Sequence, residues 1–158
     1  YPSWKLLSLF NNQATGDMLR TETISVPSVD LPAFKRRQAV QDAPLAAVYA
    51  TRRGNRYAVF VVSRKVPDYP LAGDDGYIPV TIELPFHRAR RVTLYRMAGN
   101  PMANNILADE VKIDKIELPA SRLNRHFTLN TENGADNRGL SQAATFLYVF
   151  DGVSVEKR

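Results

Sequence analysis

The sequence of 158 residues contains no cysteine and only two histidines. The absence of cysteine excludes disulfides, thiol catalysis and cysteine-based zinc sites, but it does not separate a reducing compartment from an oxidising one. The histidines, His87 and His126, are too few for a histidine-rich metal site, and neither belongs to a catalytic motif. We therefore predict that both histidines lie at the surface.

Long apolar runs and phosphate-binding loops are also missing. No stretch approaches the roughly 20 apolar residues of a membrane-spanning helix, so we predict no membrane partner. No glycine-rich motif of the GxGxxG or GxxxxGKT type is present, so we predict no nucleotide cofactor. A calcium ion is a minor alternative, because loop aspartates bind calcium, although no DxDxDG pattern occurs. The loop aspartates in question are Asp68, Asp74, Asp75 and Asp136.

The acidic residues do not form a recognisable catalytic pair. A glycosidase or a protease needs two carboxylates, or a nucleophile and a base, on rigid elements that face one cleft. Asp74 and Asp75 lie in a segment rich in proline and glycine, Glu83 is on the polar face of a predicted strand, and Asp109 and Glu110 precede another strand. We predict that these carboxylates are structural or solvated, and we assign no catalytic residue.

Positive charge is in excess, with a formal net charge of +5. The basic residues cluster at 35–37, 52–56 and 87–91. Such clusters can bind polyanions, but each lies in a predicted turn or linker, where solvated charge is usual. No nucleic-acid-binding motif accompanies them, so we predict no nucleic-acid partner, and binding of another polyanion is the least favoured alternative.

The first twelve residues have a helical pattern. Trp4, Leu7 and their apolar neighbours recur at spacings of three and four, and Ser3 is available as an N-cap. The pattern ends at residues 15–16. Residues 1–4 contain no initiator methionine, basic leader or signal-like apolar core, which indicates either a processed chain or a piece of a longer one, and we favour a piece.

After residue 16 the sequence has the alternation and the turn residues of strands. Residues 18–26 predict a first strand, whereas residues 28–44 have so little periodicity that we expect an irregular connection. Residues 45–51 and 57–63 predict a hairpin whose turn contains Gly54.

Three later segments complete the predicted strand pattern. Residues 77–84 alternate as a half-buried strand does, and residues 91–97 predict the next strand. Residues 143–150 are apolar on both alternating faces, which predicts a strand in the middle of a sheet. The spacing predicts an all-β protein: an antiparallel β-sandwich of about eight strands with a short N-terminal helix.

The order of these segments resembles a known family. Residues 1–17 resemble the last barrel helix and exit segment of clan A glycoside hydrolases similar to α-L-arabinofuranosidases. Residues 57–64, 80–86 and 92–101, with Asn105, resemble the strand series of the C-terminal β-sandwich in those enzymes.

The resemblance implies an accessory role without catalysis. Residues 1–16 would be a helix left from a preceding (β/α)8 barrel, and residues 17–158 would be the sandwich. The family's catalytic glutamates come from barrel strands, and no segment here matches those positions, so no catalytic residue and no cofactor are implied. The implied partner is the barrel of the same parent chain, with Trp4, Leu7 and Phe10 as contacts.

An alternative within the same resemblance is a carbohydrate-binding module. Exposed aromatic side chains stack on sugar rings, and Tyr69, Tyr77 and Phe86 are the candidates for contact with a polysaccharide. Packing in the core explains most of the other aromatic residues better. The compartment stays open, with a secreted or periplasmic location favoured over the cytoplasm.

Overall fold

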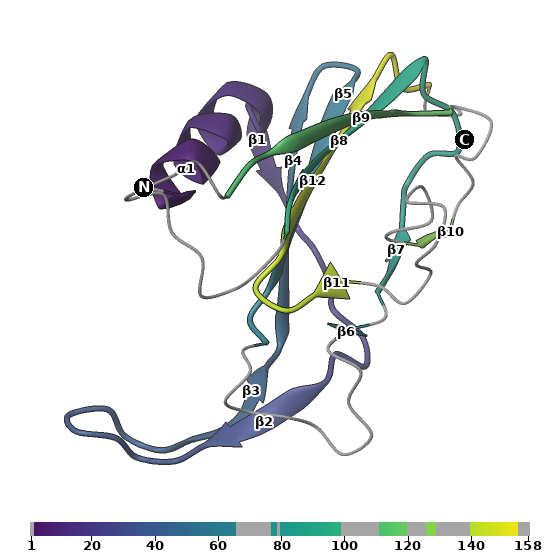
Figure 1. Cartoon of the computed structure of the whole chain (residues 1–158). Coiled ribbons are helices and arrows are strands. Elements are labelled where there is room, and N and C mark those ends of the chain that lie inside the picture. Colours follow the sequence, from purple (N-terminus) through teal and green to yellow (C-terminus); the bar gives the residue numbers. More distant parts are fainter. Residues whose placement is uncertain are drawn as a thin grey trace.

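A six-stranded antiparallel sheet, in the order β1-β4-β5-β12-β8-β9, is the main element of the fold (Figure 1). The computed structural model describes residues 2–65, 77–78, 80–98, 111–119, 126–128 and 140–154. The strands of the large sheet are β1 (Asp17–Leu19), β4 (Ala46–Arg53), β5 (Arg56–Ser63), β8 (Arg91–Met97), β9 (Asp114–Leu118) and β12 (Thr145–Asp151).

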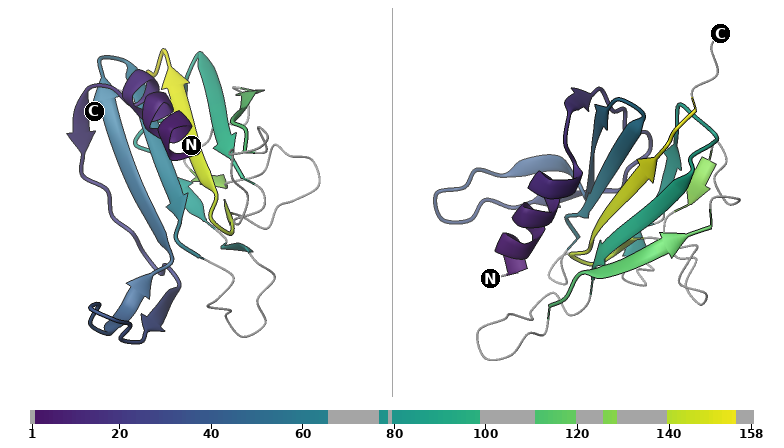
Figure 2. Two further views of the ribbon diagram at one scale, coloured as in Figure 1. Left: turned by 60° about the vertical axis from the view of Figure 1, so that its left-hand side comes forward. Right: turned by 90° about the horizontal axis from the view of Figure 1, so that it is seen from above.

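Opposite faces of this sheet are covered by different elements (Figure 1). Helix α1 (Pro2–Gln13) lies on one face. On the other face lie two small antiparallel pairs, β6 (Tyr77–Ile78) with β11 (Leu140–Ser141) and β7 (Thr81–Glu83) with β10 (His126–Thr128). Figure 2 shows the same arrangement from two other directions, and the predicted all-β antiparallel sandwich with a short N-terminal helix is confirmed.

Strand β12 lies in the middle of the large sheet, as predicted from its doubly apolar pattern, because it pairs with both β5 and β8. Phe146, Tyr148 and Phe150 point into the main core between the sheet and the small strand pairs. Leu147 and Val149 point to the opposite side, toward α1. Since all five side chains are at most 1% exposed, this strand connects the two hydrophobic layers.

The β4–β5 hairpin also matches its prediction. Its register pairs Arg53 with Arg56 across a two-residue turn of Gly54 and Asn55. Gly54 has a φ of 60°, and it stands at the first central position, where a type II′ turn places glycine.

The helix begins two residues earlier than an N-cap at Ser3 implies. The prediction that Ser3 is the N-cap is wrong, because Ser3 lies inside α1, which starts at Pro2. Proline is well suited to the first helical position, since the N–H that it lacks would have no partner within the helix.

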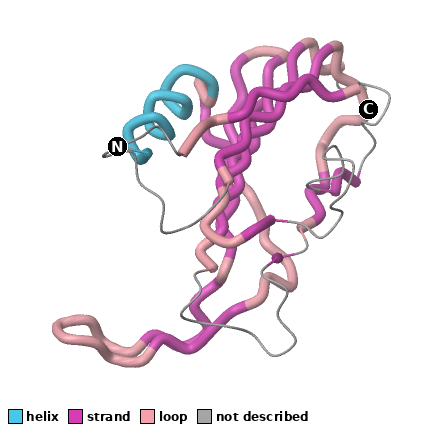
Figure 3. Tube along the Cα trace, in the orientation of Figure 1, coloured by secondary structure: helices cyan, strands magenta, loops and turns pink. Residues whose placement is uncertain are grey.

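Two other predictions for the N-terminal half are wrong. The first strand ends at Leu19, and two residues later the Thr21 hydroxyl donates to the Val48 carbonyl at 3.2 Å. The segment expected to be an irregular connection contains an antiparallel pair, β2 (Ser28–Leu31) and β3 (Val40–Pro44). This pair and the loop that joins it form an arm that extends away from the large sheet (Figures 2 and 3).

The predicted strand over residues 77–84 is divided between β6 and β7, which pair with different partners. Pro79 lies between them in the sequence, and proline has no N–H to donate to a continuous ladder. The predicted faces are correct: Ile78, Ile82 and Leu84 are buried, whereas Thr81 and Glu83 are exposed.

Candidate functional site

Helix α1 has a buried apolar side, and its outward side carries two exposed apolar residues among polar ones. On the buried side, Leu6, Leu9 and Phe10 pack against the cluster on β5 and β12, and the rings of Phe10 and Phe60 meet edge to face at 5.3 Å. On the outward side, Trp4 is 69% exposed and Leu7 is 51% exposed. An exposed tryptophan next to an exposed leucine is an apolar surface that water solvates poorly.

Two exposed apolar residues of the sheet lie on the same face as the helix. Met18 pairs across the strands with Thr51, and Thr51 pairs with Ala58, so the three side chains lie on one face of the sheet. Ala58 belongs to the apolar cluster that packs against α1. Tyr49 is paired with Phe60 on that face as well. Together with the outward side of α1, these residues make up what we call the helix face: Trp4, Leu7, Met18 and Tyr49, with 69%, 51%, 61% and 41% of their surfaces exposed.

A polar network fixes the end of α1 to the sheet. Arg56 donates from Nη2 to Gln13 Oε1 at 2.6 Å and from Nη1 to Asp151 Oδ1 at 3.2 Å. Arg91 donates from Nη2 to the other oxygen of the same carboxylate at 2.9 Å. This hydrogen bond, with the charge of Asp151, raises the pKa of the Arg91 guanidinium above its ordinary value. The helix is therefore held by polar contacts as well as by its apolar side.

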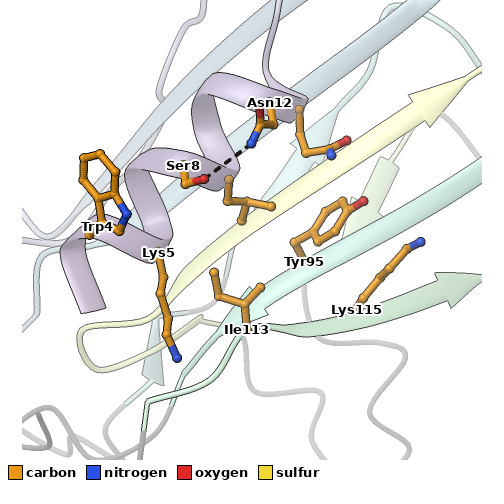
Figure 4. A pocket seen from close by; sticks show the side chains of 9 residues that line it. Trp4, Lys5, Ser8, Asn12, Tyr95, Ile113 and Lys115 are labelled. Carbon is orange, nitrogen blue, oxygen red and sulfur yellow. Dashed lines mark hydrogen bonds between the residues drawn. The ribbon is translucent and has the colours of Figure 1, made fainter. Parts of the chain in front are cut away.

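A second fixed point lies near the other end of the helix. Lys5 extends from α1 and donates from Nζ to the Val111 carbonyl at 3.3 Å, next to the start of β9. Between these two points, α1 and strands β8 and β9 border an open groove of about 500 Å³ (Figure 4). The groove is lined by Trp4, Lys5, Ser8, Leu9, Asn12, Gln13, Tyr95, Ile113 and Lys115.

Of the residues predicted to contact sugar, the structure describes Tyr77 and Phe86. Phe86 is 3% exposed, with its ring 4.9 Å from that of Tyr57 and 5.2 Å from that of Phe150, so the prediction that it is an exposed aromatic is wrong. Tyr77 is half-buried on β6, and Tyr69 lies outside the described residues.

Of the residues predicted to contact a barrel, two are accessible. Trp4 and Leu7 point outward, whereas Phe10 packs on the sheet and is half-buried. His87 is half-buried, and the side chain of His126 lies outside the described part.

Groups able to bind a metal ion are not seen in the described part of the chain. No three or more acidic, histidine or cysteine side chains come together among these residues. The aspartates considered for calcium, and the carboxylates of residues 74, 75, 109 and 110, lie outside the described ranges. In the same ranges, no helix is both long and apolar enough to cross a membrane.

Sequence patterns alone did not reveal the groove. Tyr95 alternates with the buried Leu94 on β8, which indicates only that it faces the other side of the sheet. Its place in the groove depends on where α1 lies, and no sequence pattern within β8 indicates the position of the helix.

Two solved structures resemble this chain, whereas no family model and no curated protein matches it. The first is a thermostable GH51 α-L-arabinofuranosidase from Thermotoga petrophila RKU-1, with a TM-score of 0.65 and 15% identity over 94% of this chain. The second is an arabinofuranosidase, with a TM-score of 0.50 and 12% identity over 87% of this chain.

The chain spans only part of each of these proteins, 28% of the first and 26% of the second. At such low identities, the likeness shows a shared fold. That fold is consistent with a domain of such enzymes.

Proposed function

We propose that this chain is a noncatalytic accessory domain of a glycoside hydrolase, which packs against a catalytic (β/α)8 barrel through the helix face. The observation that carries the proposal is the pair of exposed side chains, Trp4 and Leu7, on a helix whose other side is already packed on the sheet. The similar fold within two arabinofuranosidases, of which the chain spans about a quarter, supports the same assignment.

The energetics favour a partner on this face. Burying an exposed apolar side chain contributes about 1.5–3 kcal/mol. Because Trp4 and Leu7 are 69% and 51% exposed, covering the remaining surface of both would contribute about 2–4 kcal/mol in total. Met18 and Tyr49 would extend the covered surface across the sheet.

The first test is hydrolysis of an aryl α-L-arabinofuranoside by the purified 158-residue chain. We expect none, and hydrolysis that follows the protein through purification would overturn the proposal.

The second test concerns docking. The double variant Trp4→Ser and Leu7→Ser should unfold at the same urea concentration as the unmodified 158-residue chain. In a parent polypeptide that includes the barrel, the same double variant should lower the unfolding temperature by several degrees. A matched pair at exposed polar positions of the same helix, Asn11→Ser and Asn12→Ser, should have little effect in either protein. Equal unfolding temperatures for both parent variants would contradict docking through this face.

Carbohydrate binding is a second candidate, because the groove beside α1 combines aromatic and amide side chains. Trp4 and Tyr95 flank the groove with Asn12 and Gln13 (Figure 4). Aromatic faces beside hydrogen-bonding amides suit sugar rings. Calorimetry with arabinoxylan distinguishes the two candidates: binding that Tyr95→Ala abolishes favours the groove, and absence of heat counts against it.

A further inference from the structure

The tip of the β2–β3 arm carries a concentration of positive charge around an exposed aromatic ring. Phe34 and Arg37 are joined by two backbone hydrogen bonds, of 3.1 and 2.9 Å, across a turn whose central residues are Lys35 and Arg36. All four residues are exposed, and the ring of Phe34 is 63% exposed. We call these residues, Phe34 to Arg37, the arm tip.

The side chains of the arm tip are partly ordered by one another. The Lys35 ammonium lies 5.1 Å from the centre of the Phe34 ring, within the range of a cation–π interaction. Arg37 donates from Nη2 to the Pro32 carbonyl at 2.9 Å. The cations and the ring therefore form one small surface.

No acidic residue lies between Leu31 and Gln41, so the charge of the arm tip is not balanced within the loop. The nearest carboxylates in the sequence, Asp30 and Asp42, belong to the base of the arm. There, Asp30 accepts a hydrogen bond from the Asp42 backbone N–H at 2.9 Å, and Asp42 accepts one from the Ser28 hydroxyl at 3.5 Å. Acidic side chains thus support the arm, and cations occupy its end.

The turn that presents these residues has an unfavourable backbone. Lys35 has a φ of 54°, in the left-handed region that favours glycine. A residue with a side chain costs about 1–2 kcal/mol in that region. A lysine at this position is therefore not explained by the stability of the turn, whereas its charge and its contact with Phe34 would be useful for binding.

We propose that the arm tip binds the uronic acid residues of an acidic polysaccharide. The guanidinium of Arg36 can pair with a uronate carboxylate through two parallel hydrogen bonds, and Lys35 adds a second positive charge. The Phe34 ring offers an apolar face on which the adjoining sugar ring can stack. The choice of a polysaccharide among polyanions rests on the proposed role in a glycoside hydrolase.

The β2–β3 arm and α1 lie at opposite ends of the molecule in Figure 1 and in the left-hand view of Figure 2. Docking of a barrel on α1 and binding of an anionic chain at the arm are therefore compatible. The two proposals can also fail separately, since one is read from hydrolysis and domain stability and the other from polysaccharide binding.

The test is affinity electrophoresis of the 158-residue chain in gels that contain polygalacturonate or neutral arabinan. We expect retardation by polygalacturonate only, weakening steeply between about 50 and 200 mM salt, as charge-dependent binding does. The double variant Lys35→Gln and Arg36→Gln should lose about tenfold in affinity, from two exposed ion pairs. Phe34→Ala should weaken binding about threefold without changing the salt dependence, because it removes a contact without charge.

The matched control removes two exposed arginines elsewhere, Arg20→Gln and Arg53→Gln, and should change the affinity less than twofold. If this control weakens binding as much as the arm-tip variant, the net charge is responsible and the proposal fails. It also fails if the protein is not retarded by polygalacturonate. If double-stranded DNA or dextran sulfate, which contain no uronate, binds more tightly than polygalacturonate and the arm-tip variant abolishes that binding, the ligand is a phosphate or sulfate polymer, and the assignment to uronates is overturned.

Discussion

Gly16 lies between α1 and β1, where the backbone passes close to β4. Replacing it with alanine tests this close approach. Gly16 has a φ of 103°, which side chains rarely allow. A Cβ placed on it would lie 2.1 Å from the carbonyl oxygen and 2.6 Å from the carbonyl carbon of Arg52. These are backbone atoms of β4, which pairs with β1 and β5, so they cannot yield without disturbing the sheet.

The expected loss of stability combines two effects. The backbone conformation costs alanine about 1–2 kcal/mol. Relieving the clash with Arg52 costs about 1–3 kcal/mol more, as overpacking does. The Gly16→Ala variant should therefore lose about 3 kcal/mol, which lowers the unfolding temperature of a domain of this size by about 6–12 °C.

Gly54→Ala is the matched control. Gly54 also has a positive φ, of 60°, but a Cβ there would meet no atom within 4 Å. It should lose only the backbone contribution, about 1 kcal/mol. Urea unfolding followed by circular dichroism, with the fluorescence of the single tryptophan in α1 as a second probe, measures both variants. Equal losses for Gly16→Ala and Gly54→Ala would refute the close approach of the α1–β1 junction to β4.

Further substitutions test the core and the helix contacts by urea unfolding. Phe86→Ala should lose about 3–5 kcal/mol, as a buried aromatic does, and a loss below 1 kcal/mol would contradict its burial. Phe10→Ala should lose about 2 kcal/mol, whereas Trp4→Ala should change the stability of the isolated chain by less than about 0.5 kcal/mol. Arg56→Gln should lose about 1 kcal/mol, because it is partly buried between two acceptors. Arg91→Gln should have a smaller effect. Because the pKa of Arg91 is raised in the folded state, the contribution of this residue to the free energy of unfolding is constant near neutral pH. It is lost only as the pH rises through that alkaline pKa.

Alternation predicted the strands that are buried on at least one face. β8 has the bounds expected for it, and β12 has the central position that its doubly apolar pattern required. The β4–β5 hairpin followed from two apolar strands around Gly54. In these segments the side chains that decide the register are the ones that fill the core, so local pattern and packing agree.

The features that were predicted wrongly or not at all have a common cause: each depends on contacts between distant residues, which no local sequence pattern records. The β2–β3 arm has few buried side chains, with Val40 43% exposed, so its alternation carries no core signal. Phe86 follows the end of β7, where the inside–outside phase of the strand is lost, and its burial depends on Tyr57 and Phe150 from other strands. The groove depends on the placement of a helix against β8 and β9.

Helix α1 is only partly covered by the sheet on which it packs. A helix that is apolar on one side only is satisfied once that side is buried. Here, the side with Leu6 and Phe10 is packed on the sheet and the end of the helix is held by Arg56, yet Trp4 and Leu7 face outward on the opposite side. The other exposed positions that the structure describes in the helix are polar (Ser3, Ser8, Asn11 and Asn12), so its outward apolar surface is confined to Trp4 and Leu7. If a second domain covers these two residues, as proposed, substitution of Trp4 and Leu7 should leave the isolated chain unchanged and destabilise the parent polypeptide.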